Sequence, residues 1–237
     1  MRKLRYLHIR FDASIEPHEI PAFRGAVIAK AGREHDLFHN HYESAGSIYR
    51  YPLIQYKRIG RSPAIICLDE GTEDIHHFFQ NRTWDVELNG RPVELRVKDL
   101  RLNQYTLQAW EYSFSFSIRH WLALNQENYL RFMELPYERD RIDFLERILR
   151  GNILSMAKGL DWYIDREVRV RIRHLSPPRK QRFKEHLLTA FDATFDTNVF
   201  LPDFIGLGKG VSLGFGVVTR RKEEGRRGER EQRSNDQ

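Results

Sequence analysis

The sequence predicts an α+β fold with antiparallel sheets, made of two tandem ferredoxin-like (RRM-like) units that each have the order β-α-β-β-α-β. Three observations predict it. Strand and helix patterns follow this order up to about residue 108, the order then begins again, and a glycine-rich segment followed by a strand closes the second unit. We expect an N-terminal domain over 1–108, which carries the catalytic loop, and a C-terminal domain over 109–220. The tail over 221–237 is highly charged, so we expect it to be disordered.

The first unit opens with a strand and a helix. Leu7, Ile9 and Phe11 alternate with basic residues, which is the spacing of a strand. Pro17 and Gly32 suit the start and the end of a helix. The apolar positions between them lie on one helical face: Ile20, Phe23, Val27 and Ile28.

The rest of the first unit is predicted as two strands, a short helix and a hairpin. The strands cover 49–59 and 63–71 and are joined by a short turn. Thr72 is a suitable cap for the helix that follows. The pair Asn89-Gly90 is typical of a tight turn between two strands, so a hairpin is expected there.

The second unit begins with a strand over 112–118, where aromatic and aliphatic residues alternate with serines. Apolar residues at helical spacing predict helices over 125–134 and 139–159. Alternating valine, isoleucine and arginine then predict a strand over 168–173. After Pro177 and Pro178, the composition of residues 179–195 predicts a helix whose first turn carries several cations, and the strand GFGVVTR follows the glycine-rich loop.

Composition limits the class of protein. The net charge is +6 and the isoelectric point is near 9.5, and basic proteins of this kind often bind polyanions. The one cysteine, Cys67, excludes a disulfide within the chain and favours a reducing compartment, so a cytoplasmic location is expected. It lies in the apolar run AIICL, which predicts a packed core thiol. No apolar run is long enough to span a membrane, so we expect no membrane partner.

The candidate catalytic residues lie in and around the stretch FHNHYE. His39 and His41 are two residues apart and share one side of an extended loop, with a phenol (Tyr49) and an ammonium (Lys30) near in sequence. One imidazole can take the proton of an RNA 2′-OH while the other protonates the leaving 5′-oxygen, and a lysine can stabilise the phosphorane. The products would be a 2′,3′-cyclic phosphate and a 5′-OH. The alternative is that these are polar histidines of a surface loop.

We expect no metal and no cofactor. The letters H-N-H are contiguous here, whereas metal nucleases space such ligands across a ββα motif. A metal site needs three or four ligands, and His35 and His39 have no matching partner pattern. His76 and His77 point about 100° apart on a helix and make a poor ligand pair.

Two segments are candidates for binding RNA. Arg169, Arg171 and Arg173 form a basic stripe on a strand, which is either a phosphate track or a solvated strand face. The glycine-rich loop is either a phosphate-binding backbone or a mobile loop before a strand that bends at glycine. Its candidate RNA-binding residues are Gly206, Gly208, Lys209, Gly210, Gly214 and Gly216.

The combination of tandem units, a histidine-rich loop after the first helix and a late glycine loop resembles the CRISPR-associated endoribonucleases that process precursor CRISPR RNA. They belong to the RAMP superfamily. GLGKGVSLGFGVV is similar to the superfamily's C-terminal glycine motif, and HNHYESAGSIYRYPLIQYK is similar to one branch of the processing nucleases. The resemblance implies metal-independent cleavage within the repeats. It places the active site on Lys30, on His39 and His41, and on Tyr49, with Lys57 as a reserve lysine and RNA contact.

The resemblance also implies the partners, which are precursor and mature CRISPR RNA. Subunits of a CRISPR effector complex, and a second copy of the chain in a homodimer, are left open as further partners. The alternative function is a non-catalytic CRISPR-RNA-binding subunit of an effector complex, which would not need the acid–base cluster. A metal nuclease is the third alternative, and removal of metal by EDTA distinguishes it.

Overall fold

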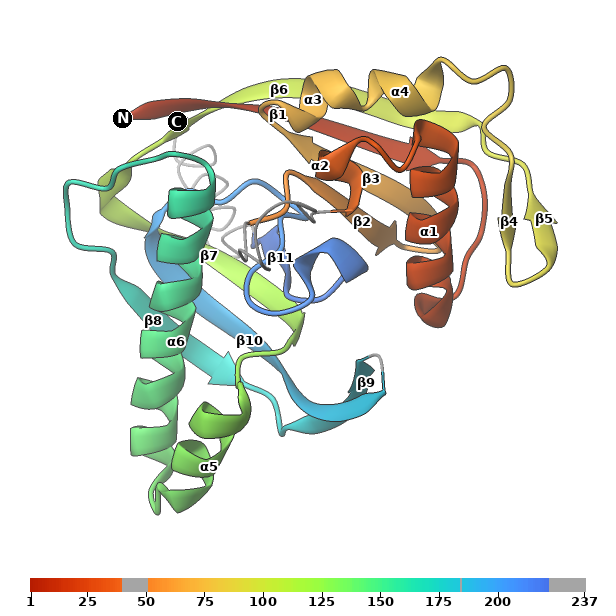
Figure 1. Ribbon diagram of the computed structural model, residues 1–237. Coiled ribbons are helices and arrows are strands. Elements are labelled where there is room, and N and C mark those ends of the chain that lie inside the picture. The colour runs from red at the N-terminus through yellow and green to blue at the C-terminus, as the bar shows by residue number, and fades with distance from the viewer. Residues whose placement is uncertain (40–50, 184, 222–237) are drawn as a thin grey trace, which may run out of the picture.

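The structure is a computed structural model of the chain, and it describes residues 1–39, 51–183 and 185–221 (Figure 1). The two sheets of the fold follow one another along the chain. The elements of the first half are β1 (Arg2–Phe11), the 3-10 turn η1 (Pro17–Glu19), α1 (Ile20–Ala31), α2 (Asp36–His39), β2 (Ile54–Ile59), β3 (Ser62–Leu68), α3 (Gly71–Asp74), α4 (His76–Phe79), β4 (Val86–Leu88), β5 (Arg91–Val93) and β6 (Val97–Leu107).

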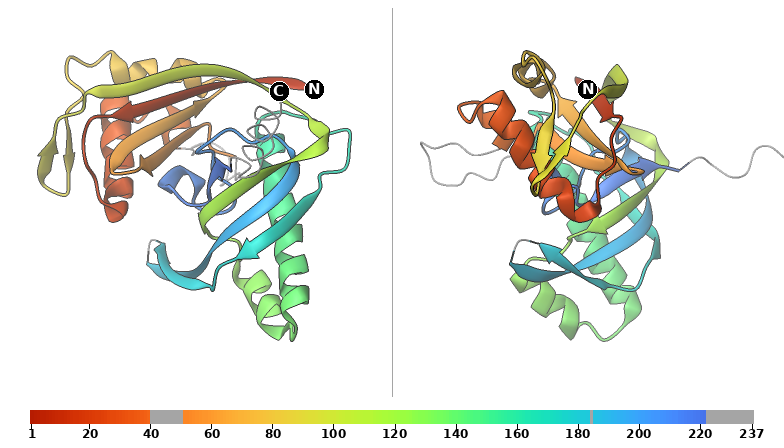
Figure 2. Two further views of the ribbon diagram at one scale, coloured as in Figure 1. Left: turned by 180° about the vertical axis from the view of Figure 1, so that it is seen from behind. Right: turned by 90° about the vertical axis from the view of Figure 1, so that its right-hand side faces the viewer.

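The second half contains α6 (Glu138–Gly159), which at 22 residues is the longest helix among the described residues (Figure 2). Its strands and helices are β7 (Ala109–Trp121), α5 (Gln126–Glu134), α6, β8 (Val170–Leu175), β9 (Arg179–Phe183), β10 (His186–Val199), the 3-10 turn η2 (Val211–Leu213) and β11 (Val217–Arg220).

Both sheets have the strand order of a ferredoxin-like unit. The first is β2-β3-β1-β6 and the second is β11-β7-β10-β8, with all neighbours antiparallel. In each, the first strand of the unit lies between its third and fourth strands, and the second strand is next to the third. The predicted fold class is therefore confirmed. β4 and β5 form the separate hairpin that Asn89-Gly90 predicts, with positive φ at both turn residues.

The helix predicted over 179–195 is wrong. These residues form the hairpin of β9 and β10, and β10 continues as the strand between β7 and β8. Many of them have high helix propensity, but Phe191, Ala193 and Phe195 are buried at a period of two, so pairing in the sheet overrides local preference.

The glycine-rich loop occupies the place of the second helix in the second unit. In the first unit, α3 and α4 connect β3 toward β6, whereas β10 and β11 are joined by a loop whose one helical element is η2. The loop has five glycines, which allow its backbone to turn back on itself. Four of them have positive φ, namely Gly208, Gly210, Gly214 and Gly216. The closing segment therefore folds against the sheets instead of covering one face with a helix.

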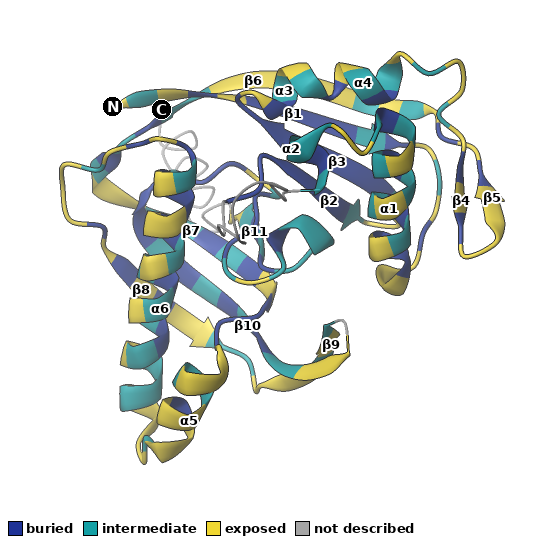
Figure 3. Ribbon diagram, in the orientation of Figure 1, coloured by how far each residue is buried: buried dark blue, intermediate teal, exposed yellow. Residues whose placement is uncertain are grey.

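The two sheets share a hydrophobic core. Along β3, Ile65 and Cys67 face α1, while Ile66 and Leu68 pack in the same cluster as Trp121 and the buried face of α6 (Figure 3). Cys67 is fully buried, as predicted. The chain passes from one sheet to the other between β6 and β7, and the division into separate domains at residue 108 stays a prediction. Apart from Arg221, the predicted tail lies outside the described residues.

Backbone packing at Gly216 yields a first prediction. Gly216 and Gly60 have similar positive φ values, 61° and 64°, but a Cβ on Gly216 would overlap the carbonyl oxygen of Leu207, whereas one on Gly60 would meet nothing within 4 Å. Gly216→Ala should therefore lower the free energy of unfolding by about 3 kcal/mol, and Gly60→Ala by about 1 kcal/mol. Urea denaturation measures both, and equal losses would contradict the packing argument.

Candidate functional site

Three side chains around the start of β2 bind the backbone of the glycine-rich loop. The Tyr51 hydroxyl donates to the carbonyl of Gly206 (2.7 Å), and the Gly206 N–H donates to Gln55 Oε1 (3.0 Å). Lys57 Nζ donates to the carbonyl of Val211 (2.9 Å). The two sequence motifs that resembled the processing nucleases are therefore in direct contact, although about 150 residues separate them in the chain.

The strand period explains why these side chains point the same way. Gln55 and Lys57 are two residues apart in β2 and lie on the face toward the second half of the chain. Ile54 and Tyr56 lie on the other face and pack in the α1 core. Gly206 allows the approach, since a Cβ there would be 2.9 Å from Lys57 Nζ.

Lys57 is fully buried, with 0% of its surface exposed. No carboxylate of the described residues forms an ion pair with it, and burial lowers the pKa of its ammonium to about 7. In this structure its described partner is the loop backbone. Lys57 therefore does not reach the surface as a direct RNA contact. It could affect bound RNA only indirectly, by positioning the loop and by the electrostatic field of its charge.

His39 is the last residue of α2, which packs beside α1. Its Nε2 is 2.8 Å from the carbonyl of Arg33 and 3.6 Å from Asp36 Oδ1, and its own carbonyl accepts from Arg24 (2.6 Å). Burial lowers the pKa of the Arg24 guanidinium. The Tyr56 hydroxyl donates to the carbonyl of Phe38 (3.1 Å), so α2 is attached to β2.

The other predicted catalytic residues are not brought together with His39 by any described contact. Lys30 Nζ donates to the carbonyl of Thr83 (2.9 Å), near the end of α1 that is remote from the glycine-rich loop. Ile20, at the opposite end of α1, contacts the loop at Gly214, and ten residues of helix span about 15 Å. His41 and Tyr49 lie outside the described residues.

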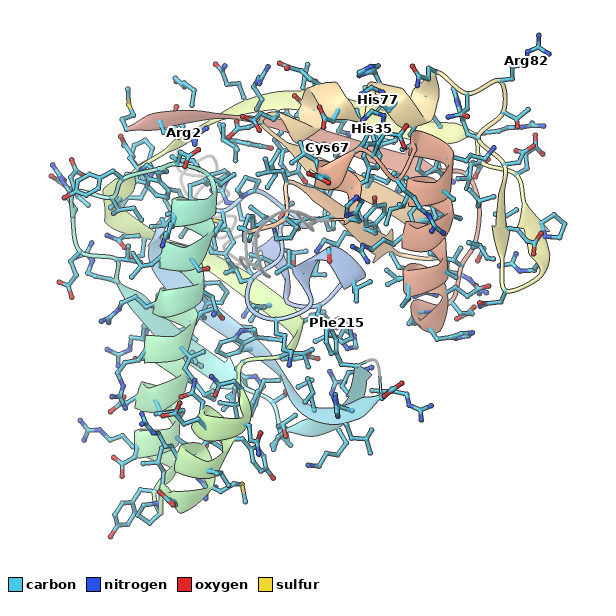
Figure 4. The ribbon with its side chains drawn as sticks, viewed as in Figure 1. Arg2, His35, Cys67, His77, Arg82 and Phe215 are labelled. Carbon is cyan, nitrogen blue, oxygen red and sulfur yellow. The ribbon has the colours of Figure 1, made fainter. Side chains whose placement is uncertain are left out.

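The exposed part of the glycine-rich loop carries a cation on an aromatic pair. Lys209 is exposed, with its Nζ 5.3 Å from the ring centre of Phe183, and Phe183 packs edge-on against Phe215 (Figure 4). The β9–β10 hairpin therefore supports the loop. Gly208, Gly210 and Gly214 are half-buried. Gly206 and Gly216 are buried, and at all five loop glycines an added Cβ would lie 3.0 Å or less from another part of the chain.

The exposed arginine stripe follows β8, the edge strand of the second sheet, with Arg171 and Arg173 in the strand and Arg169 directly before it. Arg173 forms an ion pair with Asp196 (2.6 Å), and Arg169 donates to the carbonyl of Glu111 (2.7 Å). Arg171 makes no ion pair with any described residue. Of the three, Arg173 alone is paired with a carboxylate of the described residues. Arg169 keeps its charge because its partner is a neutral carbonyl, and Arg171 keeps its charge as well.

No group of three or more potential metal-binding side chains exists within residues 1–39, 51–183 and 185–221. The nearest approach is a stack of imidazoles, in which the ring centres of His35 and His77 are 3.5 Å apart and those of His76 and His77 are 3.8 Å apart (Figure 4). Stacked rings direct their nitrogens sideways and do not converge on an ion. In the same ranges, no helix is long and apolar enough to cross a membrane.

Comparison with known proteins identifies the family. The sequence model of the Cas6b N-terminal domain matches residues 2–106, and that of the Cas6b C-terminal domain matches residues 105–221. The chain belongs to the Cas6b family. A crystal structure of Cas6b superposes on this Cas6b-family chain with a TM-score of 0.84 and 29% identity, over 93% of this chain and 100% of the other.

Two further proteins are similar to the chain. The crystal structure of a CRISPR RNA processing endoribonuclease Cas6b has a TM-score of 0.69 and 28% identity, with the same coverage. An uncharacterized protein of Methanocaldococcus jannaschii is 37% identical over 106 residues, which is 45% of this chain and 71% of that protein. The chain is thus a member of the Cas6 family of crRNA-processing endoribonucleases, and RNA is its class of partner.

Sequence reasoning missed the side chains that position this Cas6b site. Tyr51 and Gln55 bind the loop and Arg24 binds the carbonyl of His39, but none of them was a candidate. The signal for Gln55 was present, because Gln55 and Lys57 are polar residues two apart on one face of a predicted strand. A polar residue buried in a strand requires a partner, and the sequence alone did not indicate which segment supplies it.

The buried ammonium yields a prediction about pH and stability. The pKa of Lys57 is about 7 in the folded state and 10.5 in the unfolded state, so between these values the unfolded state binds more protons and stability rises with pH. Relative to Lys57→Met, the free energy of unfolding of the natural chain should rise by about 1 kcal/mol per pH unit from pH 7.5 to 9. Denaturant titrations measure this, and parallel pH profiles would contradict it.

Proposed function

We propose that the chain is a metal-independent endoribonuclease that cuts precursor CRISPR RNA within its repeats by attack of a 2′-OH, leaving a 2′,3′-cyclic phosphate and a 5′-OH. The observation that carries the proposal is that the glycine-rich loop and the residues next to the histidine-bearing segment are all hydrogen-bonded to one strand, β2. Phe38 and Tyr51, the described neighbours of the histidine-bearing segment, and the glycine-rich loop all bind side chains of β2. Tyr56 lies on one face of β2 and Gln55 and Lys57 on the other, so β2 holds both the glycine-rich loop and the start of the histidine-bearing segment. The proposal requires the RNA to follow the loop past this strand.

The reaction needs no group that the chain lacks. His39 and His41 act as general base and general acid, so that one takes the 2′-OH proton and the other protonates the 5′-oxygen as the P–O bond breaks. Tyr49 orients the 2′-OH or the phosphate. Lys30 is proposed to stabilise the negative charge of the phosphorane, which requires it to leave the carbonyl of Thr83.

The histidine pair is tested by substitution. His39→Ala and His41→Ala should each slow cleavage of repeat RNA by about 10²–10⁴-fold, because each removes one proton-transfer group. Binding of the same RNA should change by less than about threefold. His18→Ala, an exposed histidine on η1, is the matched control and should cut normally. Unimpaired cleavage by the double variant would reject this acid–base pair.

Metal independence and product ends are tested with the natural chain. Incubation with repeat RNA from its own genome in EDTA should give a single cut. The 5′ fragment should resist a 3′-end-labelling enzyme that requires a free hydroxyl until the cyclic phosphate is removed. Complete loss of cleavage in EDTA would favour a metal nuclease, and tight binding without cleavage in any buffer would favour a non-catalytic crRNA-binding subunit.

The basic stripe is tested through the salt dependence of RNA binding. Arg171→Ala should make the slope of log K against log salt shallower by about 0.7–0.9, because one phosphate contact is lost. Arg96→Ala is the control, since Arg96 is exposed and already paired with Glu94. Equal slopes for Arg171→Ala and the natural chain would show that this face is simply solvated.

A further inference from the structure

A hollow of about 580 Å³ lies beside the glycine-rich loop, between the end of β7 and the helices α5 and α6. Apolar side chains and amides line it together. The residues that matter here are Leu122, Leu124 and Ile148, which are apolar, and Asn125, Asn128 and Asn152, which carry amides. Gly208 and Lys209 of the loop form another side. A volume of this size is within the range of small-molecule binding sites.

The lining selects the class of ligand. Among the described lining residues there is no carboxylate, no arginine and no histidine, and the one cation is Lys209. A metal ion or an amine would therefore find no counter-charge. Apolar walls with several amides suit a flat, neutral, hydrogen-bonding group, and a lysine on one side suits an attached anion. A nucleotide combines these features.

The amides have unused hydrogen-bonding capacity. The side chain of Asn128 has no hydrogen-bond partner among the described residues. Asn152 uses its Oδ1 to accept from Trp121 Nε1 (2.9 Å), which leaves its NH₂ group. Asn125 caps α5 by accepting from the Asn128 N–H (2.7 Å), so it has a structural role of its own. Amide groups of this kind pair with the edges of bases.

Gly151 is a second, independent observation. It lies in the interior of α6, where glycine is less favourable than alanine, and a Cβ at this position would meet nothing within 4 Å. Packing within the chain therefore does not require the missing side chain. Gly151 lines the hollow, and its bare backbone keeps that wall open. Gly25 of α1 is equally free of neighbours but does not line the hollow.

We propose that this hollow binds one unpaired nucleobase of the RNA, with the adjoining phosphate at Lys209. This inference rests on the proposed function. Tyr51 also lines the hollow and is two residues along the chain from the candidate catalytic Tyr49. The bound nucleotide is therefore one close to the scissile phosphate, and the hollow fixes the register of the cut.

The test is a scan of abasic sites through the unpaired nucleotides of the repeat RNA. Affinity is measured in the His39→Ala, His41→Ala double variant, so that binding is followed without cleavage. One position should stand out, with affinity about 5–100-fold weaker when its base is removed. Gly151→Leu, which fills the hollow, should weaken binding of the intact RNA and abolish the difference at that position. Gly25→Leu is the matched control for a leucine in an open helix position and should preserve the difference.

A second variant with a smaller structural change keeps the proposal testable if Gly151→Leu misfolds. Asn128→Ala should reduce the effect of the abasic site at the same position and leave the thermal unfolding midpoint unchanged. The proposal is overturned if no position stands out, or if Gly151→Leu and Asn128→Ala keep the full abasic effect. Failure of the natural chain to cut RNA, with the abasic pattern intact, would reject the proposed function and leave the nucleobase site standing.

Discussion

The structure depends on how the buried backbone of the glycine-rich loop is satisfied. The segment lies between two sheets and has no long helix. Backbone bonds such as Leu207 N–H to the carbonyl of Gly216 and Val218 N–H to the carbonyl of Ile205 pair part of it, and its other buried amides and carbonyls need further partners. Side chains of the first half supply the missing partners, since Gln55 accepts from Gly206 while Tyr51 and Lys57 donate to Gly206 and Val211. These bonds fix the last part of the chain on the first sheet, and they act together with the shared core.

The same constraint explains why glycine occurs where it does. Gly216 faces the carbonyl of Leu207, and Gly206 faces Lys57, so in both places another part of the chain occupies the volume of a side chain. The sequence suggested that the bare backbone serves to admit RNA. For these two buried positions the structure gives a different reason, which is close packing within the chain. Lys209, on the exposed side, is the member of the segment that stays available to an anion.

The sequence alone was sufficient to predict an element where the environment of its residues is set by neighbours close in sequence. The alternation in β7, the apolar face of α1 and the Asn89-Gly90 turn are local patterns, and each predicted its element. The region 179–195 failed because its environment comes from β7 and β8, which are distant in sequence. The site shows the same limit. Lys57 was recognised as a candidate lysine, but its burial follows from contact with a loop about 150 residues away, which one sequence cannot reveal.

Burial of Lys57 also has an electrostatic consequence for the loop above it. An ammonium that is removed from water and paired with no carboxylate of the described residues is disfavoured, which is why its pKa is lowered to about 7. An anion on the outer side of the loop would interact favourably with the charged form and raise that pKa again. Binding of a phosphate and protonation of Lys57 would then promote one another, by thermodynamic linkage. A buried lysine can thus contribute to anion binding without touching the ligand, through the backbone dipoles of the loop that it contacts.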